Sequence, residues 1–486
     1  MFTMHSATKY RDVSNSRKDP LDACLRIFSF GMKRILSVFV CIVGGIATAE
    51  TWHIDNRTGD DANDGLASER AFKTIAKAIK LAKTSDTLVL ANTGTAYREP
   101  ITLIRHGGTP AKPFTIEGNG AVISGLREIV PSEWKQPNGD GVYEIAGPRP
   151  YGFPTLLIDG RQTAAGNLQT LKPGQWAWPR NPNSKREGVL LFRPETGKTP
   201  ADYHLEATLG VAGLQVSSSS YLVVRNLICE FHSNDGFNIH GDCRSVVCEN
   251  IEGRFNGDDG FSIHESIEAV VRNGWFHHNG SGIEDVNLSR SFYSGIRVHD
   301  NRNLGVLFIG AFHSAVDAVV ENNPSNFRIS SSVTKHLLGG EASPIRETSV
   351  YLQNVISVGG NVGMSVGGDA KVMAVNSIFR QSKTGIEMSG TSRVHLTKSV
   401  VTDCENHELS CGGQSFYGDY NIYFPGRFKI AGKEYGEADW RAFQTAAGHH
   451  AHALIQNPAL TEAHRIGDRS IIKIDKHVIG PTTFYD

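Results

Sequence analysis

Hydrophobic and polar residues alternate in short segments along most of the chain, and these segments recur at a nearly fixed interval. The segment Asn234 to His240 reads Asn-Asp-Gly-Phe-Asn-Ile-His, and the segment Asp258 to His264, 24 residues later, reads Asp-Asp-Gly-Phe-Ser-Ile-His. Further units continue the same frame at four glycines: Gly282, Gly305, Gly363 and Gly385. Units of 22 to 24 residues with short alternating strands, Gly/Asn/Asp turns and no helical period predict an all-β fold, a right-handed parallel β-helix.

A second column of residues lies about ten positions before each of these glycines. It consists of asparagines beside short β-branched segments: Asn226, Asn250, Asn273, Asn354 and Asn376. Equivalent residues of neighbouring coils lie about 4.8 Å apart in such a fold, so offsets in sequence become distances in space. We therefore expect the asparagines to stack as a structural ladder over roughly eight or more coils.

The two ends of the repeat region carry segments that predict caps. Residues 70–83 place Phe72, Ile75, Ala76, Ile79 and Ala82 at helical spacing, which predicts an amphipathic helix over the N-terminal opening. We place the β-helix itself at residues 50–413 and a C-terminal capping segment at 414–486, where the period is lost. A cap is expected because the open edge of a parallel sheet otherwise invites aggregation.

The capping segment and the early coils each contain residues with two interpretations. His449, His450 and His452 are close enough in sequence to suggest a metal site, but a capping loop is the simpler interpretation. Residues 127–215 do not repeat and predict an irregular insertion. Its tryptophans could stack on sugar rings or pack in a core: Trp134, Trp176 and Trp178.

The first fifty residues predict export rather than folded structure. Met32-Lys33-Arg34, the apolar run from Ile35 to Gly45 and the small residues before Glu50 are typical of a signal peptide at 32–49. Residues 1–31 suit neither a signal nor a core, so we expect translation to start at Met32 or this leader to be disordered. The apolar run is too short for a permanent membrane span, which predicts a secreted or periplasmic protein.

Composition limits the classes of function. The 486 residues include 49 basic and 50 acidic ones, a formal charge of -1, so the chain lacks the basic footprint of a nucleic-acid binder. Five cysteines follow the leader, an odd number that argues against a full disulfide framework. Among them Cys404 and Cys411 could pair or be buried as free thiols. We expect a monomer.

Residues 232–284 resemble the calcium-dependent pectate lyases of polysaccharide lyase family nine, which have a pectin lyase-like β-helix. In that family an Asp-Gly-Phe coil is followed by an Asp-Asp-Gly-Phe coil, as at Asp235-Gly236-Phe237 and Asp258-Asp259-Gly260-Phe261 here. The resemblance implies that Asp235, Asp258 and Asp259 bind calcium. The family's fourth aspartate is replaced by Ser262 and its catalytic lysine by Glu284.

Two further resemblances are less extensive. The segment from Trp52 to Leu126 resembles the N-terminal module of secreted parallel β-helix proteins, in runs such as Gly59-Asp60-Asp61. The polygalacturonases of glycoside hydrolase family twenty-eight are similar at Asn234-Asp235 and Asp258-Asp259. Their Gly-His-Gly corresponds to Gly280-Ser281-Gly282, and no Arg-Ile-Lys follows.

The strand alternation predicts which side chains face solvent. Phe237, Phe261 and Ile283 point inward, so His240, His264 and Glu284 should share the outer face that the aspartates border. Bound calcium would acidify the C5 proton of a uronate, with His264 or His240 as the base. Glu284 paired with Asp259 would instead suit hydrolysis.

These residues predict a carbohydrate-active enzyme that acts on a polysaccharide, an acidic glycan. Calcium-assisted β-elimination is the leading hypothesis. The alternatives are a glycoside hydrolase with paired carboxylates and a non-catalytic glycan-binding or structural β-helix protein. On the coil after Glu284, three residues could provide positive charge for the substrate: Arg297, His299 and Arg302.

Overall fold

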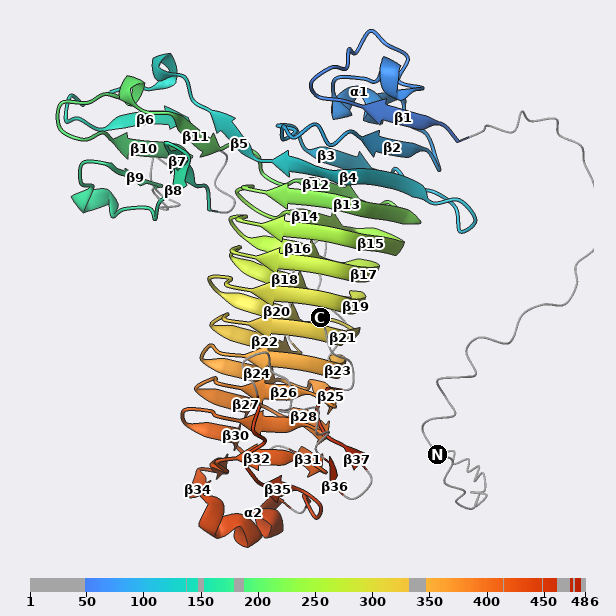
Figure 1. Cartoon of the computed structure of the whole chain (residues 1–486), viewed down its shortest axis with the longest axis vertical. Coiled ribbons are helices and arrows are strands. Elements are labelled where there is room, and N and C mark those ends of the chain that lie inside the picture. The colour runs from blue at the N-terminus through green and yellow to red at the C-terminus, as the bar shows by residue number, and fades with distance from the viewer. Residues whose placement is uncertain are drawn as a thin grey trace, which may run out of the picture. The chain divides into compact units, whose positions relative to one another are not determined.

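Parallel strands stack coil upon coil along most of the chain in the computed structural model (Figure 1). The structure describes residues 49–136, 138–146, 153–178, 188–331, 347–413, 415–447, 449–460, 473–474 and 477–481. The predicted all-β fold, a parallel β-helix, is confirmed. The leader and nearly all of the signal peptide fall on residues before Ala49, outside the described part of the chain.

Within the described residues, the coils contribute to two large sheets, one of 16 strands and one of 12. We call the first the wide sheet. Its main path contains β1 (Thr51–Ile54), β2 (Thr87–Leu90), β4 (Phe114–Ser124), β13 (Leu222–Glu230), β15 (Asp242–Arg254), β17 (Ser266–His277), β19 (Arg290–His299), β21 (Phe312–Glu321), β23 (Ser349–Val358), β26 (Ile378–Arg380), β29 (Val400–Thr402), β32 (Ile422–Phe424) and β35 (Leu454–Ile455). A branch contains β25 (Lys371–Val375), β28 (Arg393–Thr397) and β31 (Ser415–Asp419).

The second sheet, which we call the narrow sheet, has shorter strands. They are β3 (Ile101–Ile104), β12 (Leu214–Ser217), β14 (Phe237–His240), β16 (Asp259–Ile263), β18 (Ser281–Asp285), β20 (Leu304–Phe308), β22 (Ser325–Ser330), β24 (Val362–Gly367), β27 (Thr384–Met388), β30 (His407–Cys411), β33 (Phe428–Ile430) and β34 (Lys433–Tyr435). The strands pair in parallel up to β33, which pairs with β34 in the antiparallel direction.

The strand register reproduces the repeat read from the sequence. Phe237 pairs with Phe261, and Phe261 pairs with Ile283, steps of 24 and 22 residues. All three side chains are fully buried between the sheets. The alternation of inward and outward residues is therefore the physical basis of the repeat, because each apolar residue stacks on its equivalent in the next coil.

The recurring glycines are required by a column of buried asparagines, which we call the inner asparagine ladder: Asn256, Asn279, Asn301 and Asn323. A Cβ atom on Gly260 would lie 2.8 Å from Nδ2 of Asn279 and 2.8 Å from the backbone oxygen of Gly282. Glycine leaves the space that the asparagine amide fills. Each asparagine satisfies buried backbone groups at the turn before a narrow-sheet strand, as Asn279 does by donating to the Gly253 oxygen.

A second ladder lies outside, where the wide-sheet strands bend. Asn226, Asn250 and Asn273, which we call the outer asparagine ladder, have φ values of 53°, 52° and 54°. The amide of Asn250 donates to Asn226 at 3.1 Å, and that of Asn273 donates to Asn250 at 3.0 Å. Asparagine tolerates this left-handed conformation better than most residues, which explains why it recurs at the bend. The predicted ladder is confirmed at these positions.

The non-repeating region forms small antiparallel sheets with a core of their own. Its strands are β5 (Leu126–Glu128), β6 (Tyr143–Ala146), β7 (Leu156–Ile158), β8 (Arg161–Gln162), β9 (Gln175–Ala177), β10 (Val189–Arg193) and β11 (Leu205–Thr208). Trp134 and Trp176 are buried there, and Trp178 packs against the same cluster. These tryptophans are therefore core residues rather than sugar platforms.

A helix lies at the N-terminal coil and is shorter than predicted. The segment 70–83 contains α1 (Ile75–Leu81), which begins after Thr74, whose side chain accepts from the Lys77 backbone N–H. Ile75 and Ala78 of α1 are buried and join the core of the coils. Short 3₁₀ helices lie at η2 (Ser68–Arg70), η3 (Pro131–Glu133), η4 (Leu168–Thr170), η5 (Pro200–Asp202) and η6 (Glu437–Asp439).

At the C-terminal end, strand pairing continues beyond residue 413, where the sequence placed the end of the β-helix. The strands β31, β32 and β33 add to both sheets, and α2 (Trp440–Ala447) follows. Phe443 of α2 is fully buried, and its ring stacks on Phe428 of β33 at 4.0 Å. A small hairpin of β36 (Lys473–Ile474) and β37 (His477–Val478) comes last.

The three C-terminal histidines have separate partners. His450 is buried and stacks on Phe416 at 5.4 Å, and burial lowers its pKa to about 4. His452 Nδ1 lies 2.9 Å from Asp419 Oδ2, whereas the ring of His449 lies 4.4 Å from that of Tyr417. This arrangement agrees with the capping interpretation.

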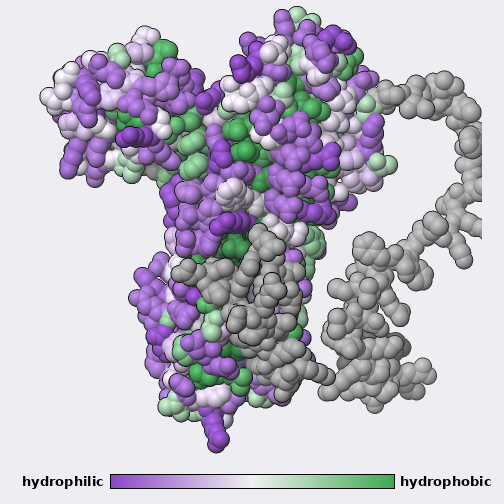
Figure 2. All heavy atoms as spheres, viewed as in Figure 1, coloured by the Kyte–Doolittle hydropathy of each residue, from purple (hydrophilic) through white to green (hydrophobic). Residues whose placement is uncertain are grey.

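The remaining features concern the polarity of the surface, the helices and the cysteine side chains. In Figure 2, hydrophilic residues cover most of the described surface in that view, and hydrophobic residues show in patches. Across the described ranges, we find no helix with the length and apolar character needed to cross a bilayer. All five cysteines in the described residues are buried and free, so Cys404 and Cys411 are not paired.

Candidate active site

The coils bring four acidic residues together on one edge of the narrow sheet. Asp235 precedes β14, Asp258 precedes β16, Asp259 is the first residue of β16, and Glu284 lies in β18. The register places Glu284 beside Ser262 and Asp259 beside Ser281, so the residues belong to adjacent coils. Electrostatic interactions link the carboxyl groups to one another. We call this set the acidic cluster.

Backbone and amide donors fix Asp235 within the acidic cluster. The backbone N–H of Asp259 donates to Asp235 Oδ1 at 3.1 Å, and the Asn234 amide donates to Oδ2 at 3.0 Å. The Asn238 amide also donates to Oδ2. Asp235 thus serves as a buried acceptor that ties one coil to the next. The Asn-Asp-Gly and Asp-Asp-Gly turns therefore have a structural role.

Burial dominates the electrostatics of the two innermost carboxyl groups. Asp235 is 1% exposed and Asp259 is 3% exposed. Burial raises the pKa of each well above its usual value, and the nearby carboxylates raise it further. Asp259 Oδ1 has no hydrogen-bond partner among the described residues. Burial and the repulsion between the carboxylates therefore both favour the protonated form of this pair.

Within the acidic cluster, Glu284 is the carboxyl group whose pKa lies close to neutral pH. Burial raises its pKa to about 7, and the negative charge of Asp258 is the second cause. Ser281 Oγ donates to Glu284 Oε1 at 3.2 Å, which holds the side chain toward the cluster. A half-buried glutamic acid beside a carboxylate is the environment in which a general acid keeps its proton at pH 7.

The positive charges nearby come from Arg302 and Arg328. Arg302 follows β19, and its Nη2 donates to the backbone oxygens of Gly257 at 2.7 Å and Asn256 at 3.2 Å, next to Asp258. Its charge and that of Asp258 attract each other. Arg328, on β22, is exposed and lowers the pKa of Glu284 against the larger effect of burial.

The insertion contributes an aromatic residue that the sequence did not single out. The Phe153 backbone N–H donates to the Ser233 oxygen at 2.6 Å, and its ring lies 5.9 Å from the Arg302 guanidinium. The side chain is 40% exposed. Phe153 could not be predicted because nothing in the repeat indicates which part of an insertion returns to the coils.

His240 and His264 lie further along the same narrow-sheet strands. Their rings stack at 4.6 Å. His264 Nε2 lies 2.7 Å from Ser262 Oγ, and Ser262 also hydrogen-bonds Asp259. His240 Nδ1 lies 3.5 Å from Glu265 Oε2. Ser262, the residue that replaces the family's fourth aspartate, thus connects a histidine to the acidic cluster.

Two of the three predicted substrate-binding residues belong to another face. Arg297 and His299 lie on β19 of the wide sheet, where Arg297 pairs with Glu321 at 2.9 Å and His299 accepts a hydrogen bond from Trp275. Only Arg302 lies beside the acidic cluster. The sequence placed all three residues on the coil after Glu284 but could not assign them to a sheet, because one coil contributes strands to both.

A buried polar network supports Glu284 from behind. Asp285 and His313 are fully buried, and Tyr293 donates to both Asp285 oxygens at 2.9 Å. His313 Nδ1 lies 3.5 Å from Asp285 Oδ2. Asp285 lies at an inward position of β18, which pairs in regular register with both of its neighbours. Tyr293 and His313 were missed because isolated polar residues at inward positions give no pattern.

The predicted calcium ligands fit a calcium ion poorly. Calcium takes six to eight oxygen ligands, whereas both oxygens of Asp235 already accept N–H donors. Among the described residues, the set of three potential ligands within 4.8 Å of one another is a different one: His278, His299 and Asp300. His299 uses both ring nitrogens, since Nδ1 lies 2.7 Å from Asp300 and Nε2 accepts from Trp275. Calcium binding therefore stays a prediction from the sequence.

Comparison with known proteins places the fold but no family. No family of proteins and no curated protein matches the chain. The complex of XylC with xylose matches with a TM-score of 0.50 and 11% identity, covering 78% of this chain and 69% of that chain. Pectate lyase Pel9A has a TM-score of 0.43 and 10% identity, over 73% of this chain and 76% of that chain. A glycoside hydrolase has a TM-score of 0.43 and 10% identity, over 79% and 95%. The likeness to XylC concerns the fold alone, and membership in polysaccharide lyase family nine stays a prediction.

Proposed function

We propose that the protein is an enzyme that cleaves glycosidic bonds of a polysaccharide, with Glu284 as the general acid. The observation that carries this proposal is the pair of Glu284, whose pKa is raised to about 7, and the neighbouring Asp258. Hydrolysis requires one protonated carboxyl group and one carboxylate on either side of the bond. Glu284 would protonate the leaving oxygen, and Asp258 would activate water or attack the sugar.

The buried residues of the acidic cluster would hold this pair in place rather than react. Asp235 is fixed by three hydrogen-bond donors, and Asp259 is only 3% exposed to solvent. Arg302, held by backbone oxygens beside Asp258, would keep that carboxylate ionised and would attract an acidic sugar. The exposed ring of Phe153 would offer a stacking surface for a substrate ring.

Elimination is the second candidate, and the histidines favour it. His264 bonds Ser262 and stacks on His240, so it could take a C5 proton while Arg302 neutralises a uronate carboxylate. The C4–O bond would then break as the C4=C5 double bond forms, and Glu284 would protonate the departing oxygen. This route does not require calcium. The third possibility, a non-catalytic glycan-binding protein, would leave the raised pKa of Glu284 without a use.

The test compares Glu284→Gln with wild type on soluble glucuronoxylan, xylan and polygalacturonate. We expect the substitution to lower cleavage by at least about 100-fold with the thermal stability unchanged. The matched control is Glu387→Gln, since Glu387 is exposed at the same outward position four coils further along the narrow sheet. Wild-type activity should fall as the pH rises through the Glu284 pKa of about 7, because the acid must carry its proton.

The products separate the candidates. New reducing ends without ultraviolet absorbance indicate hydrolysis, whereas absorbing unsaturated ends indicate elimination. Activity that survives in Glu284→Gln contradicts the assignment of the general acid. Absence of cleavage on all three glycans favours the binding protein. A chelator that abolishes activity would support the calcium prediction.

A further inference from the structure

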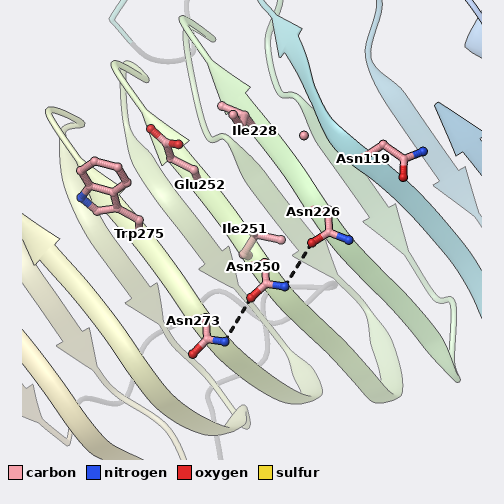
Figure 3. A pocket seen from close by; sticks show the side chains of 9 residues that line it. Asn119, Asn226, Ile228, Asn250, Ile251, Glu252, Asn273 and Trp275 are labelled. Atoms are coloured by element: carbon pink, nitrogen blue, oxygen red, sulfur yellow. Dashed lines mark hydrogen bonds between the residues drawn. The ribbon is translucent and has the colours of Figure 1, made fainter. Parts of the chain in front are cut away.

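A groove of about 530 Å³ crosses the outer face of the wide sheet, on the strands β4, β13, β15 and β17 (Figure 3). Ile228, Glu252 and Trp275 line it on one side of the strand bends, and the outer asparagine ladder lines it along the bends. None of the acidic-cluster residues lines this groove, because they belong to the narrow sheet. It is therefore a feature separate from the candidate active site.

Trp275 is held as a rigid platform in this groove. Its side chain is 42% exposed, although its Nε1 donates to His299 Nε2 at 2.7 Å. Its ring lies 4.6 Å from that of His277, which is itself buried and stacks on His299 at 4.9 Å. The indole N–H is thus used within the protein, and a ligand would meet the ring face. A fixed exposed indole loses little conformational freedom when a ligand binds.

The outer asparagine ladder presents polar groups at a regular spacing opposite the platform. Each carboxamide nitrogen carries two hydrogens. One of them donates to the preceding asparagine from Asn250 and Asn273, and to Glu117 from Asn226. The second N–H remains for a hydroxyl oxygen, and successive amides are about one strand spacing, roughly 4.8 Å, apart. An apolar ring face opposite a row of amides matches the two sides of a sugar ring, one with C–H groups and one edged by hydroxyls.

Charge around the groove disfavours an acidic ligand. Arg254 bonds Glu252 at 2.8 Å, and Arg225 bonds Glu117 at 2.7 Å. The same pairing holds for a third arginine next to the groove, Arg272 with Glu249. Arg254 also bonds Glu230 at 2.8 Å, so two carboxylates share one positive charge, and Glu252 leaves net negative charge at the groove wall. A uronate would meet repulsion there, whereas an uncharged sugar would not.

We propose that this groove is a second glycan-binding site, which takes neutral sugar units and is distinct from the acidic cluster. This proposal rests on the proposed function in one respect only: we expect the bound sugars to belong to the polysaccharide that the enzyme cleaves. The groove would hold a neutral stretch of a polymer whose acidic units reach the candidate active site on the other sheet.

The test measures binding by the full-length chain carrying Glu284→Gln, which prevents turnover. The probes are xylo-, cello- and manno-oligosaccharides and, as the acidic counterpart, oligogalacturonides, each titrated in a calorimeter. We expect at least one neutral series to bind, and Trp275→Ala to weaken that binding about fivefold or more. Trp275→Phe should retain most of the affinity, since a phenyl ring still stacks.

Phe292→Ala is the matched control, because Phe292 is an exposed aromatic residue of the neighbouring strand β19 outside the groove. It should bind like the parent. The proposal is overturned if no neutral series binds, if Trp275→Ala binds as tightly as the parent, or if oligogalacturonides show the same Trp275 dependence. These outcomes are independent of cleavage: a Glu284→Gln protein that still cleaves contradicts the proposed function and leaves the groove result standing.

Discussion

Asp235 and Asp259 show how burial of a few carboxyl oxygens changes the pKa values in the acidic cluster. Both side chains are nearly excluded from water, and Asp259 Oδ1 has no partner among the residues that the structure describes. Burial raises the pKa of both carboxyl groups in the folded protein. The folded state therefore binds a proton more tightly than the unfolded chain, whose aspartates titrate near 4.

Stability should decline as the pH rises, and Asp259→Asn should remove part of this decline. A raised folded pKa contributes stability that is complete below about pH 4 and is lost as the pH rises through the folded value. The free energy of unfolding of the variant, relative to wild type, should increase from pH 5 to pH 8. Chemical denaturation at several pH values measures it.

The control for this prediction is Asp242→Asn, which replaces an exposed aspartate of the same coil. Its difference from wild type should stay constant across the same pH range. If Asp259→Asn shows the constant difference instead, the buried pair is ionised in the folded protein, and a bound cation becomes the better explanation.

At the scale of the element, the two asparagine ladders differ in their environment. The inner ladder is fully buried and satisfies backbone groups at the turns, whereas the outer ladder lies on partly exposed bends. An unpaired buried polar group costs about 1 to 3 kcal/mol, but an exposed one bonds water instead. The same residue type therefore contributes very differently to stability at the two positions.

Asn279→Ala should lower the free energy of unfolding by roughly 2 to 4 kcal/mol. The substitution removes the acceptor for the Asn256 backbone N–H and the donor to the Gly253 oxygen, and both groups stay buried. Asn273→Gly on the outer ladder is the comparison, since glycine accepts the positive φ and Gly295 fills the equivalent position of the next coil. It should cost less than about 0.5 kcal/mol. Equal losses would contradict the difference in environment.

The sequence predicted the coils and the acidic cluster because both follow from the repeat. An offset of 24 residues between Asp235 and Asp259 becomes contact between adjacent coils once the strands are parallel. It did not predict the inner ladder, since Asn256 and Asn279 lie in turns whose amino-acid sequences differ from coil to coil. It also could not separate Arg297 from Arg302, because side-chain alternation fixes inward or outward but does not say which sheet a strand joins.

The stack of coils has exposed strand edges unless something covers them, and α2 lies against β33 and β34 at one end. Phe443 packs against Phe428 and Trp440, with ring distances of 4.0 and 5.2 Å. Its side chain is fully buried. The helix thus joins the last part of the core and shields strands that could otherwise pair with another molecule.

Phe443→Ala should lower stability by about 3 to 5 kcal/mol and promote association between molecules. Thermal unfolding measures the first effect, and light scattering at a temperature below the transition measures the second. Arg441→Ala, at an exposed position of the same helix, should change neither. Scattering equal to that of wild type would show that α2 fills the core without protecting the edge.

The order of strands within each coil has a consequence for how such a protein can change over generations. Glu252 of the groove is followed by Asp259 in the next strand, and Trp275 is followed in the same way by Glu284. Each of these coils thus contributes one residue to the groove and one to the acidic cluster from a single continuous segment of chain. A tandem duplication of one coil would therefore copy the groove residue and the acidic residue together. The proposed binding groove and the candidate active site would lengthen by the same amount, and neither would have to evolve alone.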